Sequence, residues 1–380
     1  MRRGYPPVML FLLFVLSNLV LRSGALIVEG PPVPANSIAS SLVSGREGGR
    51  GKDGVTCIAS TASGRTLIVG TKTGRILVSS REDQGGLPTT LEELTSDVYS
   101  TKFPIYSLAI GERDGDEFIF VGSGDRFVSE WRREGVGFNF VRTFGPHTGW
   151  VKALAYDGGT NTLHSIGCNR IEGWDFNQVD NARHISERTI DSSPRMGSTL
   201  SSDMLCLCLI EGRCLISGGV DGRMHCWSLD PTDAKPLFSC RFHDGRVNGI
   251  VYHTLLGLIF SVGHDGVLHV SRLTFDALMG GMEAIAAFKI EGTTRLSTLC
   301  IVSESPSDCK LGLGSTDGRV IIIQVTASED SIFIAEGDTL EVDGNPMIYS
   351  LCMRSAPSNV VCTPSILVGH ANGLIEWDLS

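Results

Sequence analysis

The chain has 380 residues, of which 42% are hydrophobic and 19% charged, a balance that supplies a core and excludes wholesale disorder. Its 32 basic and 42 acidic residues give a net charge of −10, which argues against binding nucleic acid through bulk positive charge. Eleven cysteines are too few for a small scaffold held by disulfides. The 45 glycines indicate a globular protein with many turns.

The N-terminus has the three-part layout of a secretory signal peptide. Two arginines precede an apolar run of 14 residues from Val8 to Leu21, and small residues follow up to a cleavage position after Ala25. This run is shorter than the ~20 apolar residues of a membrane-spanning helix. We therefore expect residues 1–25 to be a cleaved signal peptide, with no stable membrane span left in the mature chain.

The segment that follows leaves the final compartment open. Residues 26–36 are interpreted as a linker or a transit-like segment, at the start of a stretch up to Asp53 that is rich in Pro, Ser and Gly. The signal peptide predicts the secretory pathway, with a lumenal or secreted protein. The alternative is the plastid of an alga with a complex plastid, where a signal peptide is followed by a transit-like segment.

From residue 37 to residue 380 one pattern repeats seven times. Each unit has an apolar strand, a short turn, a second apolar strand that ends in glycine, a tight turn and a third strand, as in MLCLCLIEGRCLISGGVDGRMHCW from Met204. From the first tight turn to the last, 299 residues span six steps, so the period is about 50 residues. The tight turns centre on Gly74, Asp125, Asn169, Gly222, Gly266, Gly318 and Gly373.

Such units are small sheets with two apolar faces, which become stable when they stack around a ring. The repeat therefore predicts an all-β chain, a seven-bladed β-propeller of four-stranded antiparallel blades. The last unit ends with its third strand, so its blade lacks an outermost strand. Residues 278–287 are expected to hold a short helical turn.

Short motifs give the units a family likeness. Trp-Asp closes the third strand at Trp174 and Trp377, and a histidine enters a unit at His147 and His243. On these motifs the chain resembles the WD-repeat β-propellers over residues 37–380. The resemblance implies that an N-terminal strand closes the ring, and residues 37–44 are the candidate for it. The resemblance also implies a hydrogen-bonded set of His, Ser or Thr, Asp and Trp inside a blade. It gives such structural roles to His147, Trp174, Asp221, Trp227, His243, Ser261, Asp265 and Trp377.

Motifs for catalysis, metals and cofactors were sought without success. No nucleophile elbow, phosphate-binding loop or zinc-protease motif occurs, so no catalytic residue, metal or cofactor is predicted. Cys206 and Cys208 point to one face of a strand, but no second pair lies at zinc-site spacing. The cysteines of the first strands are interpreted as small buried hydrophobic residues.

Arginine recurs at the second turn of five units. Equivalent positions lie on one rim of a propeller, so these side chains predict a broken basic ring that would bind an acidic peptide or a phosphate-bearing partner. The alternative is that each arginine only packs its stem and leaves its head in solvent. The five predicted partner-binding residues are Arg75, Arg126, Arg170, Arg223 and Arg319.

Two functions follow from this sequence. The favoured one is a non-catalytic scaffold that binds one or more proteins, an acidic peptide among the candidates, and no nucleic acid. The alternative is a propeller hydrolase or lyase that acts on a small molecule or glycan at the central channel. Carboxylates or histidines converging on the channel would favour the enzyme.

Overall fold

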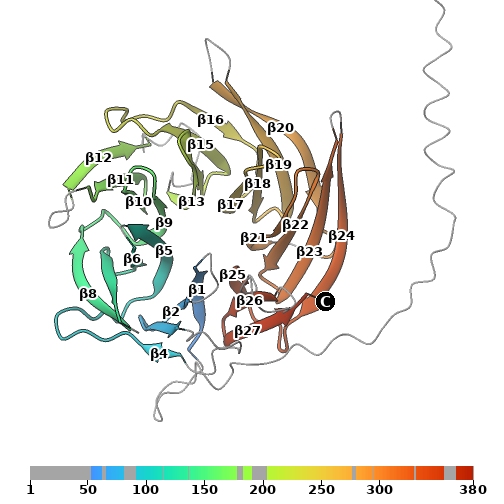
Figure 1. Cartoon of the computed structure of the whole chain (residues 1–380). Helices are drawn as coiled ribbons and strands as arrows, with labels where there is room; N and C mark the ends of the chain where they lie inside the picture. Colours follow the sequence, from blue (N-terminus) through green and yellow to red (C-terminus); the bar gives the residue numbers. More distant parts are fainter. Residues whose placement is uncertain are drawn as a thin grey trace, which may run out of the picture. The chain divides into compact units, whose positions relative to one another are not determined.

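The computed structural model describes residues 53–61, 66–80, 91–113, 115–135, 137–177, 183–190, 203–275, 280–293, 295–328, 331–354 and 365–379. These residues form seven antiparallel sheets, six with four strands and one with three. The sheets stand as blades around a central axis (Figure 1). The chain is an all-β seven-bladed propeller, as the repeat predicted. The predicted signal peptide, the segment 26–36 and the predicted closing strand 37–44 lie outside the described residues.

Blades 1 to 7 follow chain order, and each runs from an innermost strand outwards. The innermost strands, each in contact with the innermost strands of both neighbouring blades, are β1 (Val55–Ser60), β5 (Ile105–Arg113), β9 (Val151–Asp157), β13 (Met204–Ile210), β17 (Val247–His253), β21 (Leu296–Glu304) and β25 (Ile348–Arg354). The second strands are β2 (Thr66–Thr71), β6 (Asp116–Ser123), β10 (Thr162–Gly167), β14 (Cys214–Gly219), β18 (Leu258–Gly263), β22 (Asp308–Ser315) and β26 (Ser365–His370).

The outer half of each blade completes the sheet. The third strands are β3 (Ile76–Ser80), β7 (Val128–Glu134), β11 (Arg170–Asp175), β15 (Arg223–Ser228), β19 (Val267–Phe275), β23 (Arg319–Ala327) and β27 (Gly373–Asp378). The outermost strands of blades 1 to 6 are β4 (Glu92–Glu93), β8 (Gly137–Phe144), β12 (Arg183–Thr189), β16 (Phe238–Arg241), β20 (Gly280–Lys289) and β24 (Ile332–Glu341).

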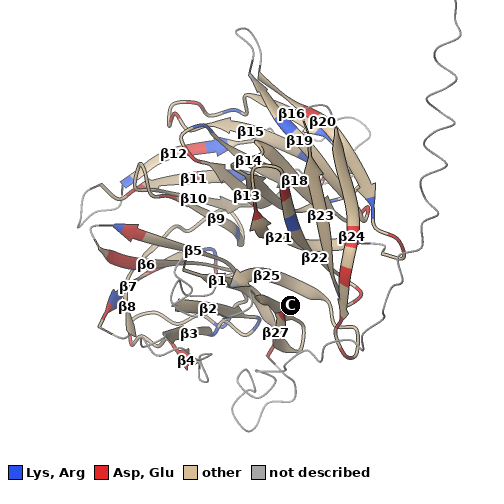
Figure 2. Cartoon of the chain, turned by 45° about the vertical axis from the view of Figure 1, so that its right-hand side comes forward, with Lys and Arg blue, Asp and Glu red and all other residues tan. Residues whose placement is uncertain are grey.

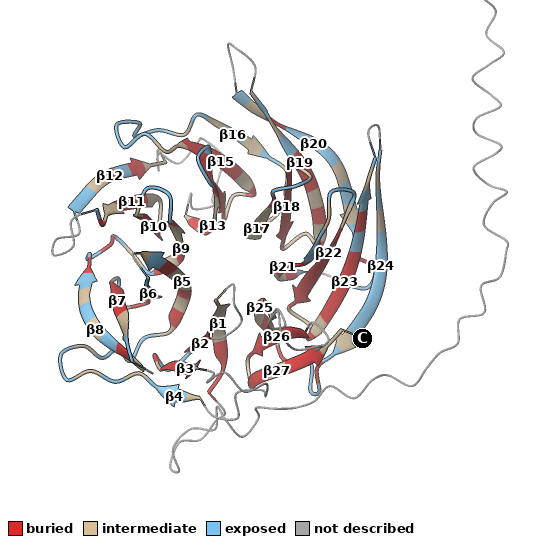
Figure 3. Ribbon diagram, in the orientation of Figure 1, coloured by how far each residue is buried: buried red, intermediate tan, exposed pale blue. Residues whose placement is uncertain are grey.

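The core lies between the blades. Every residue of β10, β14 and β18 is buried, whereas the outermost strands are largely exposed (Figure 3). Neighbouring blades share apolar clusters, for example Phe260 of blade 5 with Leu313 of blade 6. The two apolar faces of a blade are thus buried by its neighbours, at about 25 cal/mol for each Å² of apolar surface removed from water.

A glycine near the end of the second strand receives the first residue of the next blade. A Cβ atom placed on Gly218 would lie 2.6 Å from Cγ1 of Val247, a distance that real carbon atoms do not reach. The same contact joins the last blade to the first, since a Cβ on Gly369 would lie 2.6 Å from Cγ1 of Val55. The five glycine seams are Gly70–Ile105, Gly122–Val151, Gly218–Val247, Gly314–Ile348 and Gly369–Val55.

The other two seams exchange the roles of the partners. Ile166 and Val262 stand where the other blades have glycine, each paired with the third residue of its inner strand. The residues that begin the next inner strands there are Met204 and Leu296, which pack in the same clusters and are unbranched at Cβ. Each seam therefore holds one Cβ-branched side chain against a slimmer partner.

Each inner strand begins with a β-bulge. In all seven blades the register to the second strand shifts after the first residue, so the second residue is an extra, unpaired one. A bulge redirects the side chain of its extra residue. The bulged residues are Thr56, Tyr106, Lys152, Leu205, Asn248, Ser297 and Tyr349.

The helical turn expected over residues 278–287 is wrong where the structure describes that segment. Residues from Gly280 onward belong to β20, which pairs with β19 along its whole length. The long β19 offers a free edge, and pairing with it outweighs the local preference of the segment. No helix among the described residues is long and apolar enough to span a membrane.

The open edge of blade 7 yields a test of ring closure. Among the described residues β27 pairs only with β26, so we expect residues 37–44 to add the fourth strand. Deleting residues 1–25 should leave the thermal midpoint unchanged. Deleting residues 1–51 should lower it by about 3 °C or more, the size expected for a loss of ~2 kcal/mol in a single domain of this length. Equal midpoints for the two truncations, measured by calorimetry, would show that another segment closes the ring.

Candidate functional site

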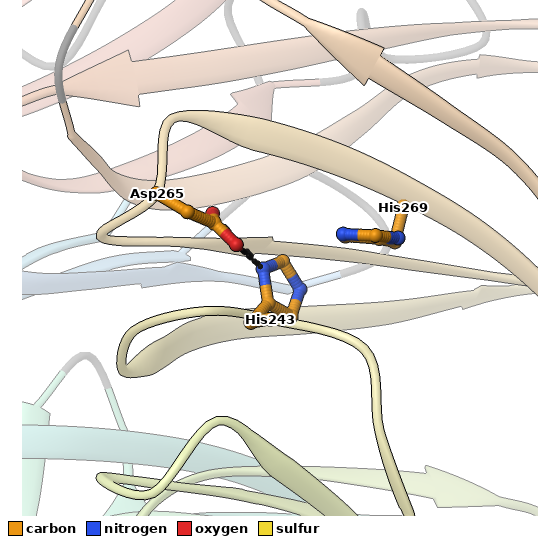
Figure 4. A group of neighbouring side chains, drawn as sticks. All are labelled: His243, Asp265 and His269. Carbon is orange, nitrogen blue, oxygen red and sulfur yellow. Dashed lines mark hydrogen bonds and ion pairs between the residues drawn. The ribbon is translucent and has the colours of Figure 1, made fainter.

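A histidine inside blade 5 links a serine and an aspartate. His243 Nδ1 lies 2.9 Å from a carboxylate oxygen of Asp265, and its Nε2 lies 2.9 Å from Oγ of Ser261. His243 precedes β17, Ser261 lies in β18, and Asp265 lies in the turn that follows. The three residues therefore tie the loop entering the blade to its central hairpin. Figure 4 shows the His243–Asp265 contact.

The order Ser–His–Asp is that of a nucleophilic triad, yet this set is enclosed. The side chains of His243 and Ser261 are fully buried, so Ser261 Oγ has no approach for a substrate. Burial opposes ionisation of Asp265, but hydrogen bonds from His243 and from the amides of Val267 and Asp244 outweigh it and hold the pKa of this carboxyl below its ordinary value. A half-buried carboxylate with this many hydrogen bonds stabilises the turn.

The same histidine belongs to the one group of three potential metal ligands found among the described residues. Ligand atoms of His243, Asp265 and His269 lie within 4.8 Å of one another. Both ring nitrogens of His243 are already bonded within the blade, and His269 packs edge-on against its ring, with centroids 4.5 Å apart (Figure 4). Burial, and then the neighbouring His243, lower the pKa of His269. The arrangement is that of a packed polar core.

Blade 3 carries a second set of this kind. His147 Nε2 lies 2.7 Å from Oγ of Ser165, and Trp174 Nε1 donates to the same oxygen at 3.2 Å. In place of an aspartate, the carbonyl of Arg126 in blade 2 lies 3.1 Å from His147 Nδ1. Ser165 was not predicted from the sequence, although β10, β14 and β18 each carry a serine two residues before their last glycine.

The remaining predicted structural residues lie in blades 4 and 7. Trp227 Nε1 donates to Ser217 Oγ at 2.9 Å. Asp221 accepts a hydrogen bond from the amide of Arg223 at 3.1 Å and so caps the tight turn. Trp377 is buried against Ile366 in the core shared with blade 6.

The predicted ring of arginines proves to be largely neutralised by acids of the same blades. Arg75 Nε lies 3.1 Å from Glu93 of the outermost strand β4, and Arg170 Nη1 lies 2.8 Å from Glu187 of β12. In the same way Arg223 pairs with Asp221 at 3.6 Å, and Arg319 pairs with Asp317 at 2.9 Å.

The fifth arginine of the ring has a backbone role. Arg126 adopts a left-handed φ of 77°, a conformation that is costly for a residue with a Cβ atom. Its carbonyl accepts the hydrogen bond of the His147 amide at 2.9 Å. Its side chain is exposed.

Closer to the axis, the starts of the inner strands carry a different set of side chains. In six blades the carbonyl just before the inner strand accepts a hydrogen bond from an amide of the tight turn, as His264 donates to Arg246 at 3.0 Å. These positions and the bulged residues therefore share one end of the ring. An aromatic and basic group gathers there, which we call the axial patch: Tyr106, Trp150, Lys152, Arg246 and Arg295.

The aromatic part of the axial patch spans blades 2 and 3. The rings of Tyr106 and Trp150 stack with centroids 5.6 Å apart, and Trp150 remains 53% exposed. The Lys152 ammonium lies 3.4 Å from the centroid of the Tyr106 ring and 4.7 Å from that of Trp150. Burial, with a further contribution from Arg246, lowers the pKa of Lys152 to about 8, although Cys168 acts in the opposite direction.

The basic part of the axial patch comes from blades 5 and 6. Arg246 and Arg295 are exposed, and neither guanidinium has a hydrogen-bond or ion-pair partner among the described residues. Burial and then both arginines lower the pKa of His264, so these three groups lie close enough for their charges to interact. The patch was not predicted from the sequence, because its members come from four blades.

Carboxylates and histidines of the described inner strands lie at the opposite end, in the last two residues of each strand. They are Glu112, Asp157, His253 and Glu304. Asp157 accepts the amide of Gly159 at 2.9 Å, and His253 Nδ1 accepts the amide of Leu256 at 3.1 Å. Two of the four thus cap turns.

The cysteines behave as core residues. The ten described cysteines are free thiols, six of them buried and four half-buried. Burial raises the pKa of Cys57, Cys206 and Cys300 to about 12. Such thiols are largely unreactive, because the thiolate is the nucleophile.

Comparison with models of known protein families finds no match to this chain, and a search among curated proteins finds none either. The propeller architecture is therefore established here by the seven sheets and their arrangement.

The buried His147 makes stability depend on pH. Burial comes first among the causes that lower its pKa to about 4, so the folded chain keeps this ring neutral while the unfolded chain protonates it near pH 6.5. The contribution of the neutral His147 to the free energy of unfolding is complete above pH 6.5 and is lost as the pH falls towards 4. The loss between pH 7.5 and 5 is about 2 kcal/mol. Denaturant unfolding should show this pH-dependent loss reduced in His147→Gln.

A neighbour requires a matched background for this measurement. Burial raises the pKa of Glu172 to about 7. The folded protein therefore gains stability as the pH falls and this carboxyl becomes protonated. The wild type and His147→Gln should therefore also be compared in a Glu172→Gln background. If the free energy of unfolding changes with pH by the same amount with and without His147, burial does not keep this imidazole ring neutral.

Proposed function

We propose that the protein is a non-catalytic interaction scaffold, a WD-repeat propeller that presents one face to a partner protein. The observation that carries this proposal is that the His–Ser–Asp set is bonded inside a blade, whereas exposed aromatic and basic side chains gather at the axial patch. In the His–Ser–Asp set of blade 5, His243 and Ser261 are buried, Asp265 is half-buried, and the three are linked by hydrogen bonds within the fold. By contrast, the axial patch presents a half-exposed tryptophan and two arginines without partners among the described residues.

Exposed aromatic and arginine side chains are the residues most enriched where protein partners bind tightly. The WD-repeat assignment is supported by the Trp-Asp and His motifs and by the hydrogen bonds of His243 and His147 within their blades. The enzyme alternative gains no support from the described inner strands, where two of the four acids and histidines cap turns.

We further propose that the chain enters the secretory pathway through residues 1–25 and works in a lumen or outside the cell, with the complex plastid as the alternative. The buried thiols are compatible with an oxidising compartment, because their raised pKa values keep them protonated. A reporter fused to residues 1–53 decides between these destinations, and diffuse cytosolic fluorescence would overturn both.

Site-specific crosslinking tests the scaffold function. Phe103 precedes β5 beside the axial patch and is 54% exposed, while Phe333 on the outermost strand β24 is 67% exposed and serves as the matched control. A photoreactive phenylalanine at position 103, introduced in the source cell, should form adducts with a discrete protein. The same group at position 333 should not form them. No adduct at position 103, or the same adducts at both positions, would contradict a partner-binding face at the axial patch.

A further inference from the structure

We propose that the axial patch binds a short acidic segment of a partner protein, with carboxylates held by Arg246, Arg295 and Lys152 and an adjoining side chain laid on Trp150. This inference rests on the proposed scaffold function and names the chemistry of the partner. It places acidic-peptide binding at the starts of the inner strands, inside the predicted ring of arginines.

The first argument is the contrast between paired and unpaired cations. Arg75, Arg170, Arg223 and Arg319 lie within ion-pair distance of acids in their own blades, so an incoming carboxylate would have to displace a partner. Arg246 and Arg295 have no such partner among the described residues. An unpaired guanidinium is free to bind a carboxylate with two parallel hydrogen bonds.

The second argument is that the cations repel one another. Arg246 contributes to lowering the pKa of Lys152 in blade 3, and Arg246 and Arg295 both lower that of His264. Binding of an anion would reduce the electrostatic repulsion between these like charges. Among the described acids, Asp265 acts on the pKa of His264 in the opposite direction, and Asp244 lies two residues from Arg246 but within 3.9 Å of Arg241.

The third argument limits the length of the ligand. The chain has a net charge of −10, and exposed acids lie along the outermost strands, such as Glu336, Asp338 and Glu341 on β24 (Figure 2). A long polyanion such as a nucleic acid would extend from the patch onto negative surface. A few acidic residues would fit the patch and avoid that repulsion.

The fourth argument is the aromatic surface. Trp150 stacks on Tyr106, and Lys152 lies over both rings, so the indole is held in place before a ligand arrives. A fixed aromatic surface costs little conformational entropy on binding. It offers apolar contact to a side chain next to the acids of the ligand.

The test uses the folded mature chain and a displayed library of random 12-residue peptides. Peptides selected on the wild type should be enriched in clustered Asp and Glu. They should bind at least tenfold more weakly to a patch variant that combines Lys152→Met, Arg246→Gln and Arg295→Gln. The matched control combines Arg75→Gln, Arg223→Gln and Arg319→Gln, which removes the same charge from the outer ring and should keep the affinity within twofold. Thermal midpoints should confirm that both variants fold.

A pH series adds a signature that is specific to Lys152. Its ammonium faces the rings of Tyr106 and Trp150, with Cys168 and Arg246 nearby. Because only the charged form attracts a carboxylate, affinity for a selected acidic peptide should fall as the pH rises above about 8. Lys152→Arg, which stays charged, should retain its affinity at pH 9.

Several outcomes would overturn the inference. Selected peptides without acidic enrichment, equal binding to the patch variant, or loss of binding in the outer-ring variant would each contradict it. Tighter binding of a 20-residue oligothymidylate than of any selected peptide at physiological salt would show a nucleic-acid site instead. If photocrosslinks form at position 103 while the selected peptides are not acidic, the scaffold function stands and only the acidic partner is wrong.

Discussion

The contact between a branched side chain and a glycine at the seams of the ring is the constraint on which the rest of the structure depends. A blade has two apolar faces and is not stable alone, so each blade must lie close enough to its neighbour to exclude water. Glycine in the second strand allows Val or Ile at the start of the next inner strand to reach the backbone in five seams. Where Ile166 or Val262 replaces glycine, Met204 or Leu296 replaces the branched partner.

This packing determines where function can reside. The seam residue is the first of each inner strand, and the bulge follows at once, so the same contact fixes the position of the redirected side chain. Lys152 next to Val151 is held in this way. The residues most suited to catalysis, such as His243 and Ser261, are used inside the blades to join loops to hairpins.

Much of the fold could be predicted from the sequence, because each strand and tight turn leaves a local pattern. The seven units were predicted on this basis, whereas the association of His243 with Ser261 and Asp265 was implied by the resemblance to the WD-repeat propellers. Pairing across a sheet leaves no such pattern. The acids that neutralise Arg75 and Arg170 lie on outermost strands about 17 residues further along the chain, and β20 forms only because β19 offers an edge.

The axial patch could not be predicted for a related reason. Its members come from blades 2, 3, 5 and 6, and ring closure alone brings them to one end. The sequence does hold a trace of it, since Trp150 and Lys152 flank the seam residue Val151. Their significance becomes clear only when the bulge turns Lys152 towards Tyr106 of the preceding blade.

A double-mutant cycle across the seam between blade 7 and blade 1 tests the central claim most directly. Gly369→Ala should destabilise the protein by ~1–3 kcal/mol, because the added Cβ would overlap Val55. Gly158→Ala, where nothing lies within 4 Å, is the control and should be nearly neutral. In a Val55→Ala background the cost of Gly369→Ala should fall by about 1 kcal/mol or more. Additive effects of the two substitutions, within ~0.5 kcal/mol, would contradict a ring held by this contact.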